Sequence, residues 1–263
     1  MFKYDFMRTA FFVGGLLALV LPLIGTNLVL KRMSMIGDAL SHVALSGVAL
    51  GLILGINPLL VAVVLSLLSS LMIIFIDKRL AAYSEISIAV VMSLGIGLTG
   101  VLLGFIHNAQ NFNAYLFGSV VAIRPEDNII SILLSFVILF ISLYYYRELM
   151  FVAMDEKGAR LSGIKVDFFN GLLLFLTAMT VAIASRIVGA LVVSSLLVLP
   201  VTVAMQFAKS YRDLVFKSML FSILFMFLGL TLSFYLDLRP GGTIVLTAVF
   251  AYLLSLFINF KKH

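Results

Sequence analysis

The sequence predicts an all-α membrane protein, a polytopic bundle of about eight or nine transmembrane helices. Of its 263 residues, 63% are hydrophobic and only 11% are charged, whereas a soluble domain has ~45–50% apolar and ~25% charged residues. Long stretches carry no formal charge, and a transmembrane helix needs only ~20 consecutive, mostly apolar residues. No stretch is long or polar enough for a separate extramembrane domain, so we expect one transmembrane domain over residues 1–263.

Charge-free runs locate the individual spans. Residues 39–76 carry no formal charge, and Gly55-Ile56-Asn57-Pro58 interrupts that run near its middle, which predicts two helices joined by a tight turn. Residues 86–123 are a second uncharged run. Its later half is too polar and too short to cross again, so we expect an interfacial or re-entrant segment there. The nine expected spans are 11–30, 36–54, 58–76, 86–106, 128–146, 168–185, 187–207, 214–236 and 243–260.

The basic residues predict the orientation of the bundle. With the loop 147–167 placed in the cytoplasm, most of the 18 Lys and Arg residues fall inside. Cytoplasmic loops carry an excess of Lys and Arg, so the N-terminus is expected outside and the C-terminus inside a bacterial cytoplasmic membrane. The net charge of +6 is then explained by Lys and Arg residues in the cytoplasmic loops. A nucleic-acid partner is unsupported, because no basic stripe lies on a soluble face. The basic residues left outside are Lys3, Arg8, Arg124, Arg186 and Arg239.

The residue types that are missing exclude several functions. The chain has no cysteine, so disulfides and thiolate metal sites are excluded. It has no Gly-x-x-x-x-Gly-Lys-Ser/Thr, the loop that cradles nucleotide phosphates, and no His-Glu-x-x-His or Gly-x-Ser-x-Gly motif. We therefore expect that the chain is not itself an enzyme and that any ATP hydrolysis belongs to another subunit.

Asp38 and His42 are the strongest candidate site within the spans. An aspartate at the centre of a membrane costs ~2.5–3.5 kcal/mol on insertion scales, so such residues usually face a cavity and mark an ion path. A spacing of four residues puts both side chains on one helix face, and Ser34 and Ser46 extend the series at the same spacing. Carboxylate and imidazole together suit zinc, and also manganese or iron(II). The alternative is an Asp38 that pairs with Lys31 or Arg32 at the membrane surface beside a satisfied core histidine.

Glycine marks the opposite face of the same helix. Gly47, Gly51 and Gly55 recur every four residues, a pattern that lets a neighbouring helix approach closely. One side of this helix is therefore predicted to pack and the other to line a polar path.

The loop 147–167 is the only sizeable cytoplasmic segment in this topology. Asp155 and Glu156 are expected at the positive end of a short helix, and Gly163 can cap its other end. An amphipathic helix here is a candidate docking element, with a solvated connector as the alternative.

Several further residues have a functional and a plainer interpretation. Pro200 should kink its helix, and Ser194 and Ser195, one to two turns earlier, could satisfy freed backbone groups or line a path. His107, in an external loop, is a candidate for first contact with incoming cations, against a solvated histidine. Glu126 and Asp127 follow Pro125, where capping of a helix is the plainer interpretation.

Three segments of the chain carry a recognisable pattern: LKRMSMIGDALSHVALSGVALG at residues 30–51, YLFGS at 115–119 with PED at 125–127, and VGALVVS at 188–194. These motifs resemble those of the membrane permeases of bacterial ABC importers for zinc and manganese, and look closest to the zinc-uptake branch. The likeness covers essentially the whole chain. The family's Pro-Ala-Ala-Thr-Ala is here Pro200-Val201-Thr202-Val203-Ala204, and its late turn is here Pro240-Gly241-Gly242.

This resemblance implies a homodimeric permease bound to two cytoplasmic ATPase subunits and supplied by a metal-binding lipoprotein or periplasmic protein. It holds no permanent cofactor, and the transported cation is zinc in the first instance. By position, Asp38 and His42 match the residues proposed to meet the cation. The family's coupling helix matches the loop around Met154, Asp155, Glu156, Ala159 and Gly163. The alternatives are a manganese or iron(II) importer of the same type and an ion-coupled secondary transporter, which would carry more buried charges and often repeated halves.

Overall fold

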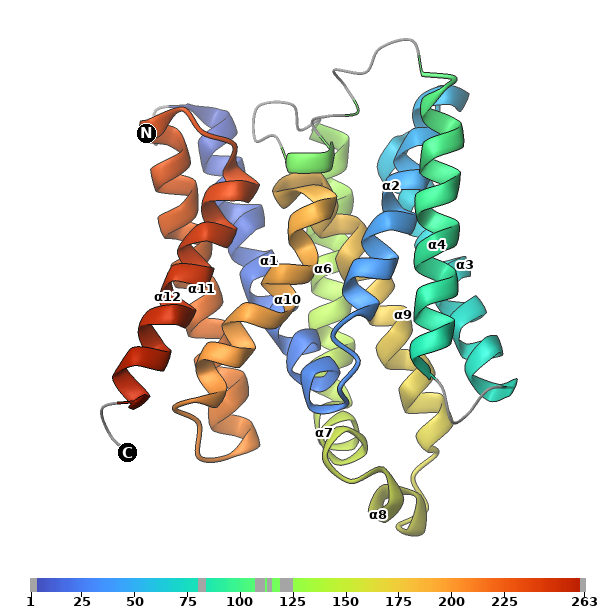
Figure 1. Cartoon of the computed structure of the whole chain (residues 1–263), viewed down its shortest axis with the longest axis vertical. Helices are drawn as coiled ribbons and strands as arrows, with labels where there is room; N and C mark the ends of the chain where they lie inside the picture. The colour runs from blue at the N-terminus through green and yellow to red at the C-terminus, as the bar shows by residue number, and fades with distance from the viewer. Residues whose placement is uncertain (1–3, 80–83, 107–111, 113–114, 119–124, 261–263) are drawn as a thin grey trace.

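The computed structural model describes residues 4–79, 84–106, 112, 115–118 and 125–260, and within these ranges it contains helices and no strand. Eight of the described helices are long and apolar enough to cross a membrane, as the sequence predicts (Figure 1). They are α1 (Asp5–Leu30), α2 (Ile36–Leu54), α3 (Pro58–Arg79), α4 (Ser84–Leu103), α6 (Pro125–Tyr144), α9 (Val166–Ala184), α11 (Tyr211–Leu236) and α12 (Pro240–Phe260).

The remaining expected span, 187–207, contains a shorter helix. α10 (Ala190–Met205) has 16 residues, which at 1.5 Å per residue gives a length of ~24 Å. A π-helical turn, η1 (Ser185–Gly189), precedes it, and Gly189 has a φ of +100°. The glycine permits this backbone conformation. α10 then runs back toward the end of the bundle from which α9 comes, and α1 begins at the end opposite to that where α12 finishes (Figure 1).

The predicted tight turn between α2 and α3 is confirmed. Gly55 ends α2 with a φ of +68°, the left-handed conformation that glycine adopts at helix C-termini. Asn57 caps the N-terminus of α3, since its side-chain oxygen accepts a hydrogen bond from the backbone N–H of Leu59 at 2.9 Å. The break in the charge-free run is therefore made by a glycine cap followed by an asparagine cap.

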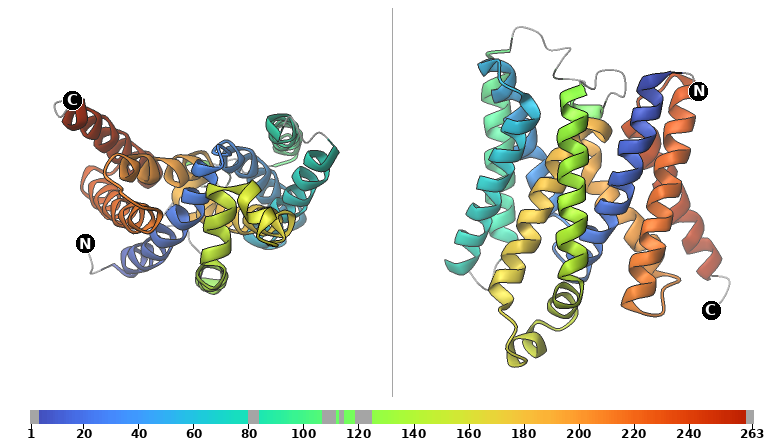
Figure 2. Two further views of the ribbon diagram at one scale, coloured as in Figure 1. Left: turned by 90° about the horizontal axis from the view of Figure 1, so that it is seen from below. Right: turned by 180° about the vertical axis from the view of Figure 1, so that it is seen from behind.

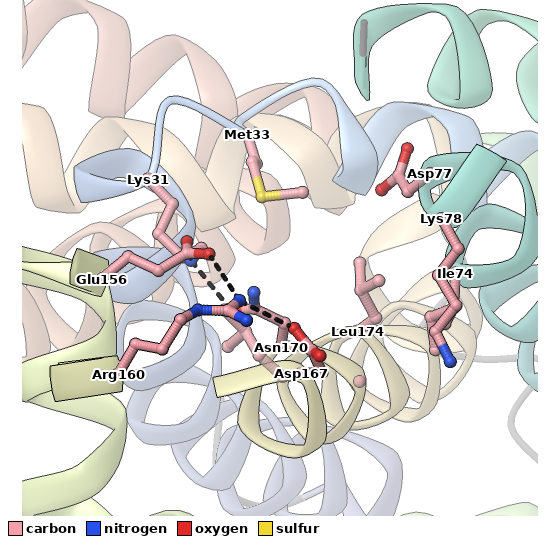
Figure 3. Close-up of a pocket in the computed structure, with 12 residues that line it drawn as sticks. Lys31, Met33, Ile74, Asp77, Lys78, Glu156, Arg160, Asp167, Asn170 and Leu174 are labelled. Carbon is pink, nitrogen blue, oxygen red and sulfur yellow. Dashed lines mark hydrogen bonds and ion pairs between the residues drawn. The ribbon is translucent and has the colours of Figure 1, made fainter. Parts of the chain in front are cut away.

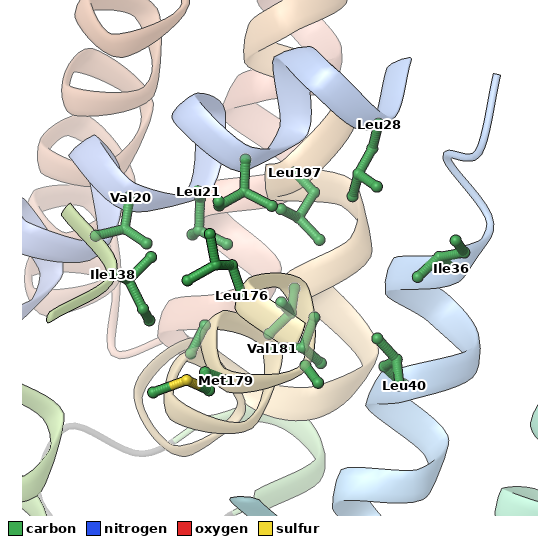
Figure 4. Close-up of a cluster of buried hydrophobic side chains, with 14 of the residues drawn as sticks. Val20, Leu21, Leu28, Ile36, Leu40, Ile138, Leu176, Met179, Val181 and Leu197 are labelled. Atoms are coloured by element: carbon green, nitrogen blue, oxygen red, sulfur yellow. The ribbon is translucent and has the colours of Figure 1, made fainter. Parts of the chain in front are cut away.

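The core is formed mainly by α1, α2 and α9, which are mostly buried, whereas α3, α4, α6, α11 and α12 have a minority of buried residues. Leu21 of α1, Leu176 of α9 and Leu197 of α10 meet in this core with less than a fiftieth of their surface exposed (Figure 4). The outer helices expose large apolar side chains, such as Leu68, Leu133 and Phe216. An apolar outer surface around a packed centre is the arrangement expected of helices that contact lipid. Figure 2 shows the bundle from below and from behind.

The glycine face of α2 lies against α3, as the spacing of four residues predicts. A Cβ on Gly47 would lie 2.5 Å from Cα of Ala62, and a Cβ on Gly51 would lie 2.7 Å from Cα of Pro58. Both distances are far below van der Waals contact, so even a methyl group would push the two helices apart.

We expect Gly47→Ala to lower the thermal stability of the purified protein, because α3 must move to admit the methyl group. Overpacking of this kind typically costs ~1–3 kcal/mol. Gly97→Ala, on α4, is the matched control, since nothing lies within 4 Å of its added Cβ. Thermal unfolding in detergent would show a lower midpoint for Gly47→Ala alone. Equal midpoints for the two variants would contradict the close contact between α2 and α3.

Candidate metal-transit site

Asp38 and His42 lie on one partly exposed face of α2, as predicted. Asp38 is in the first turn of the helix and His42 follows one turn later, and both side chains are intermediate in exposure. The first turn favours a carboxylate because the helix dipole is positive there. α2 thus holds a carboxylate and an imidazole next to each other within an apolar bundle.

Helices α10 and α4 flank this face of α2 (Figure 1). Ser194 of α10 donates a hydrogen bond to Oδ1 of Asp38 at 3.5 Å. On the other side, Thr99 of α4 donates to the backbone oxygen of His42, also at 3.5 Å. A Cβ on Gly95 would lie 2.9 Å from the carbonyl carbon of His42. α4 therefore contacts the backbone of His42 and α10 contacts the carboxylate of Asp38, while both candidate ligands remain partly exposed.

Ser46 does not share the open face. It is fully buried, and its hydroxyl donates to the backbone oxygen of Val43 at 2.7 Å. The α-helix has 3.6 residues per turn, so each step of four residues turns a side chain by ~40°, and Ser46 is rotated by ~80° from Asp38. Ser34, the other member of the series, precedes α2. The polar stripe is therefore reduced to Asp38 and His42 on the helix itself.

The described part of one chain does not by itself complete a metal site. Among the residues that the structure describes, no group of three or more His, Cys, Asp or Glu side chains lies close enough to hold a metal ion. Asp38 and His42 are two donors, whereas zinc in proteins takes four ligands in a tetrahedral arrangement. Any cation held here needs further donors from water or from another chain.

The residues predicted at the kink of α10 differ in burial and in the residues that they contact. Pro200 is buried within α10, and α1 passes so close to that region that a Cβ on Gly25 would lie 2.0 Å from the backbone oxygen of Leu197. This tight packing favours a structural role for Pro200. Ser195 is partly exposed, like Ser194, but only Ser194 contacts Asp38. His107 lies outside the described residues.

The loop predicted to be cytoplasmic forms two short helices, α7 (Tyr146–Met154) and α8 (Glu156–Leu161). Asp155 caps α8, because its carboxylate accepts a hydrogen bond from the backbone N–H of Gly158 at 2.9 Å. Gly163 has a φ of +82° just after the helix. Both capping expectations are confirmed.

The candidate coupling residues differ in exposure. Met154 is 63% exposed, while Ala159 is completely buried. Leu161, which the sequence analysis did not select, is 90% exposed at the end of α8. Apolar side chains this exposed at the tip of a loop can contact a partner protein, whereas Ala159 packs inward and supports the loop. In the sequence, Leu161 is a large apolar residue within a mostly polar segment, and this contrast is the signal that could have indicated it.

Ion pairs connect α8 with the ends of α1 and α9 (Figure 3). Lys31, whose side chain is only 9% exposed, donates to Glu156 at 2.8 Å and to Asn170 at 2.9 Å. Arg160 pairs with Asp167 at 3.0 Å. These residues line a cavity of about 420 Å³. Because Lys31 stands between α1 and α2, its ion pair with Glu156 links α8 to the segment that precedes the helix carrying Asp38.

Asp127 makes contacts that the sequence analysis missed. Its carboxylate pairs with Nε of Arg186 at 3.0 Å, with both side chains less than 5% exposed, and it also accepts from Asn57 at 3.0 Å. The guanidinium of Arg186 lies 4.3 Å from the ring centre of Tyr115. Asp127 therefore does more than cap a helix, because one carboxylate oxygen binds Asn57, just before α3, and the other binds Arg186 of η1.

Loss of one member of this buried pair should strongly destabilise the protein. Arg186→Met leaves the carboxylate of Asp127 buried without its cation, and such a loss typically costs ~3–5 kcal/mol. The double variant Arg186→Met/Asp127→Asn removes both charges and should be more stable than Arg186→Met alone. Heat-induced aggregation in detergent would rank the three proteins. If Arg186→Met were as stable as the parent, the pair would not hold α6 to η1.

Comparison with known proteins shows a family and several relatives that resemble this chain over nearly its whole length. The model of the ABC 3 transport family matches residues 3–259. The chain is 34% identical to the "Probable metal transport system membrane protein" of Treponema pallidum, covering 97% of this chain and 96% of that protein. It is 30% identical to the high-affinity zinc uptake system membrane protein ZnuB of Haemophilus influenzae, covering 97% and 98%. It is 29% identical to the manganese import system permease protein ScaB of Streptococcus gordonii, covering 99% and 94%.

A solved structure shares the fold. PsaBC from Streptococcus pneumoniae, solved in complex with Fab, superposes with a TM-score of 0.87 at 29% sequence identity. The match covers 97% of this chain and 92% of that chain. The arrangement of helices around Asp38 and His42 is therefore part of an architecture found in a solved structure.

Proposed function

The chain belongs to the ABC 3 transport family, and on that premise we propose that two copies of it form the membrane path of an ATP-driven zinc importer. The chain is a multi-pass membrane protein and a permease of the metal ABC transporter type. The observation that carries the proposal is the pair of Asp38 and His42 on the open face of α2. Membership of an ABC transport family supports an ATP-driven importer over an ion-coupled secondary transporter.

The transit site is shared between two copies of the chain. One copy offers a carboxylate and an imidazole, and a two-fold axis beside α2 would bring a second carboxylate and a second imidazole. Four such donors match the tetrahedral preference of zinc. The carboxylates offset the charge of a dication in a region of low dielectric constant, where an uncompensated charge is costly. A site assembled from two chains can also open when the chains move apart, which allows release.

Zinc is the first choice of cargo and manganese or iron(II) is the second. Half of the proposed donors are imidazole nitrogens, which suit zinc better than manganese, whereas manganese prefers oxygen ligands. The relatives include a protein named for zinc uptake and one named for manganese import. The balance of nitrogen and oxygen donors at Asp38 and His42 is what favours zinc.

The partners follow from the loop and from the family. A cytoplasmic ATPase subunit would bind α8, where Leu161 and Met154 are exposed. The ion pair of Lys31 with Glu156 would transmit its movement to α2. A metal-binding lipoprotein or periplasmic protein would deliver the cation at the opposite end of the bundle.

Reconstitution tests the proposal. The permease, its ATPase and its metal-binding protein are placed in proteoliposomes, and uptake of zinc and manganese is measured with and without ATP. We expect ATP-dependent accumulation of zinc that exceeds that of manganese at equal free concentration. Faster manganese uptake would favour the second candidate, and uptake without ATP would contradict the proposal.

A further inference from the structure

A groove lies on the side of the bundle away from the candidate transit site. In Figure 1, α2 and α10 lie toward the viewer with α6 behind them, and the view from behind in Figure 2 brings α6 to the front. The groove has a volume of about 710 Å³ and lies between the corner of α6 and α7 and the beginning of α11. It is therefore separate from the face that carries Asp38 and His42.

Two arginines stand at this groove without a counter-ion. Arg147 of α7 and Arg212 of α11 both line it and both are exposed. Neither forms an ion pair with any residue in the described part of the chain. The acidic neighbour of Arg212, Asp213, is already paired with Lys217 at 2.8 Å and also accepts from the backbone of Lys209. The groove therefore has two cationic side chains available for an anion.

The remaining lining is apolar and aromatic. Met150, Val215 and Met219 line the groove, while Leu143, Tyr144 and Phe216 are exposed beside it. Tyrosine at the end of a span is typical of the membrane–water interface. α6 ends at Tyr144 and α11 begins at Tyr211, so the arginines stand where apolar helix gives way to polar chain. A small soluble anion would leave this apolar lining without a partner.

We propose that this groove binds one anionic phospholipid of the cytoplasmic leaflet. The phosphate diester lies between Arg147 and Arg212, and an acyl chain follows the apolar lining alongside Met219 and Phe216. Basic pockets between transmembrane helices on the cytoplasmic side are known to hold anionic headgroups. A zwitterionic lipid offers the same phosphate, but its ammonium group cancels the net charge that two arginines attract.

Native mass spectrometry of the full-length chain in detergent tests this proposal. The probes are phosphatidylglycerol and phosphatidylethanolamine with identical acyl chains. We expect one phosphatidylglycerol to bind at least tenfold more tightly than phosphatidylethanolamine, because each cationic side chain near an anionic headgroup strengthens binding by roughly fivefold. Arg147→Gln/Arg212→Gln should abolish this preference, whereas Arg147→Lys/Arg212→Lys should retain most of it.

Two controls test whether the lipid preference arises from this groove rather than from other basic residues or from phosphate binding alone. Lys78→Gln/Arg79→Gln removes two cations from the end of α3, outside the groove, and should leave the preference unchanged. Millimolar inorganic phosphate should not displace the lipid, because phosphate gains nothing from the apolar lining. The proposal is overturned if the glutamine variant at Arg147 and Arg212 still prefers phosphatidylglycerol, if the α3 variant loses the preference equally, or if free phosphate competes.

Discussion

Asp38→Asn should abolish zinc uptake by the reconstituted transporter, reducing it by at least 100-fold. The asparagine keeps the shape of the side chain but removes the charge that offsets a dication where water is scarce. Ser194 can still donate to the amide oxygen at this position, so the local structure of α2 is expected to persist. Expression and assembly with the ATPase should therefore remain near those of the parent, which assigns the loss to transport.

His42→Ala should have an effect of similar size, because it removes the nitrogen donor of the same site. The double variant should be little worse than either single variant, since residues that act as one site are not additive. Asp237→Asn is the matched control: it also removes a carboxylate, but from an exposed turn with a φ of +53° that asparagine tolerates. Full uptake by Asp38→Asn would show that transport does not need this carboxylate and would contradict the assignment of Asp38 to the transit site.

Leu161→Glu should prevent assembly with the ATPase subunit. Leu161 is 90% exposed at the tip of α8, and burial of a leucine side chain at an interface contributes ~1.5–3 kcal/mol. The glutamate removes that contribution and adds a charge that must lose its water. We expect at least tenfold weaker copurification of the ATPase and loss of transport, while the permease alone retains its thermal stability.

Two further variants serve as comparisons for Leu161→Glu. Leu161→Met conserves volume and apolar character and should assemble normally. Ala159→Leu should behave differently from Leu161→Glu, because Ala159 is buried and a larger side chain there should lower the stability of the permease itself. Normal copurification of Leu161→Glu would show that the ATPase binds elsewhere on the cytoplasmic surface.

The helices could be predicted from the sequence because membrane spans leave a strong signal. Charge-free runs show where the chain can lie in lipid, and Gly55 followed by Asn57 shows where it turns. Asp38 and His42 were recognisable for the same reason, since ionisable groups are conspicuous in an apolar segment. The caps of α8 at Asp155 and Gly163 depend on local chain geometry, which the sequence also reveals.

Other features depend on distances that the sequence does not contain. Asp127 and Arg186 each look like ordinary charges at the end of a helix, and only the packing of α6 against η1 makes them a buried pair. The pairing of Lys31 with Glu156 joins residues far apart in the chain. Ser46 does not share the open face of Asp38 and His42, because positions four residues apart rotate steadily around a helix of 3.6 residues per turn. The burial of Ala159 likewise follows from the packing of α8 against α7 and α9.

X-ray absorption spectroscopy at the zinc edge tests the shared site most directly. The transporter would be loaded with zinc while its ATPase is held inactive, and the spectrum would be compared with that of the His42→Ala protein. We predict a four-coordinate zinc with two imidazole nitrogens and two carboxylate oxygens, and loss of the bound zinc in the variant. A zinc spectrum that is unchanged by His42→Ala would contradict the assignment of Asp38 and His42 as the transit site.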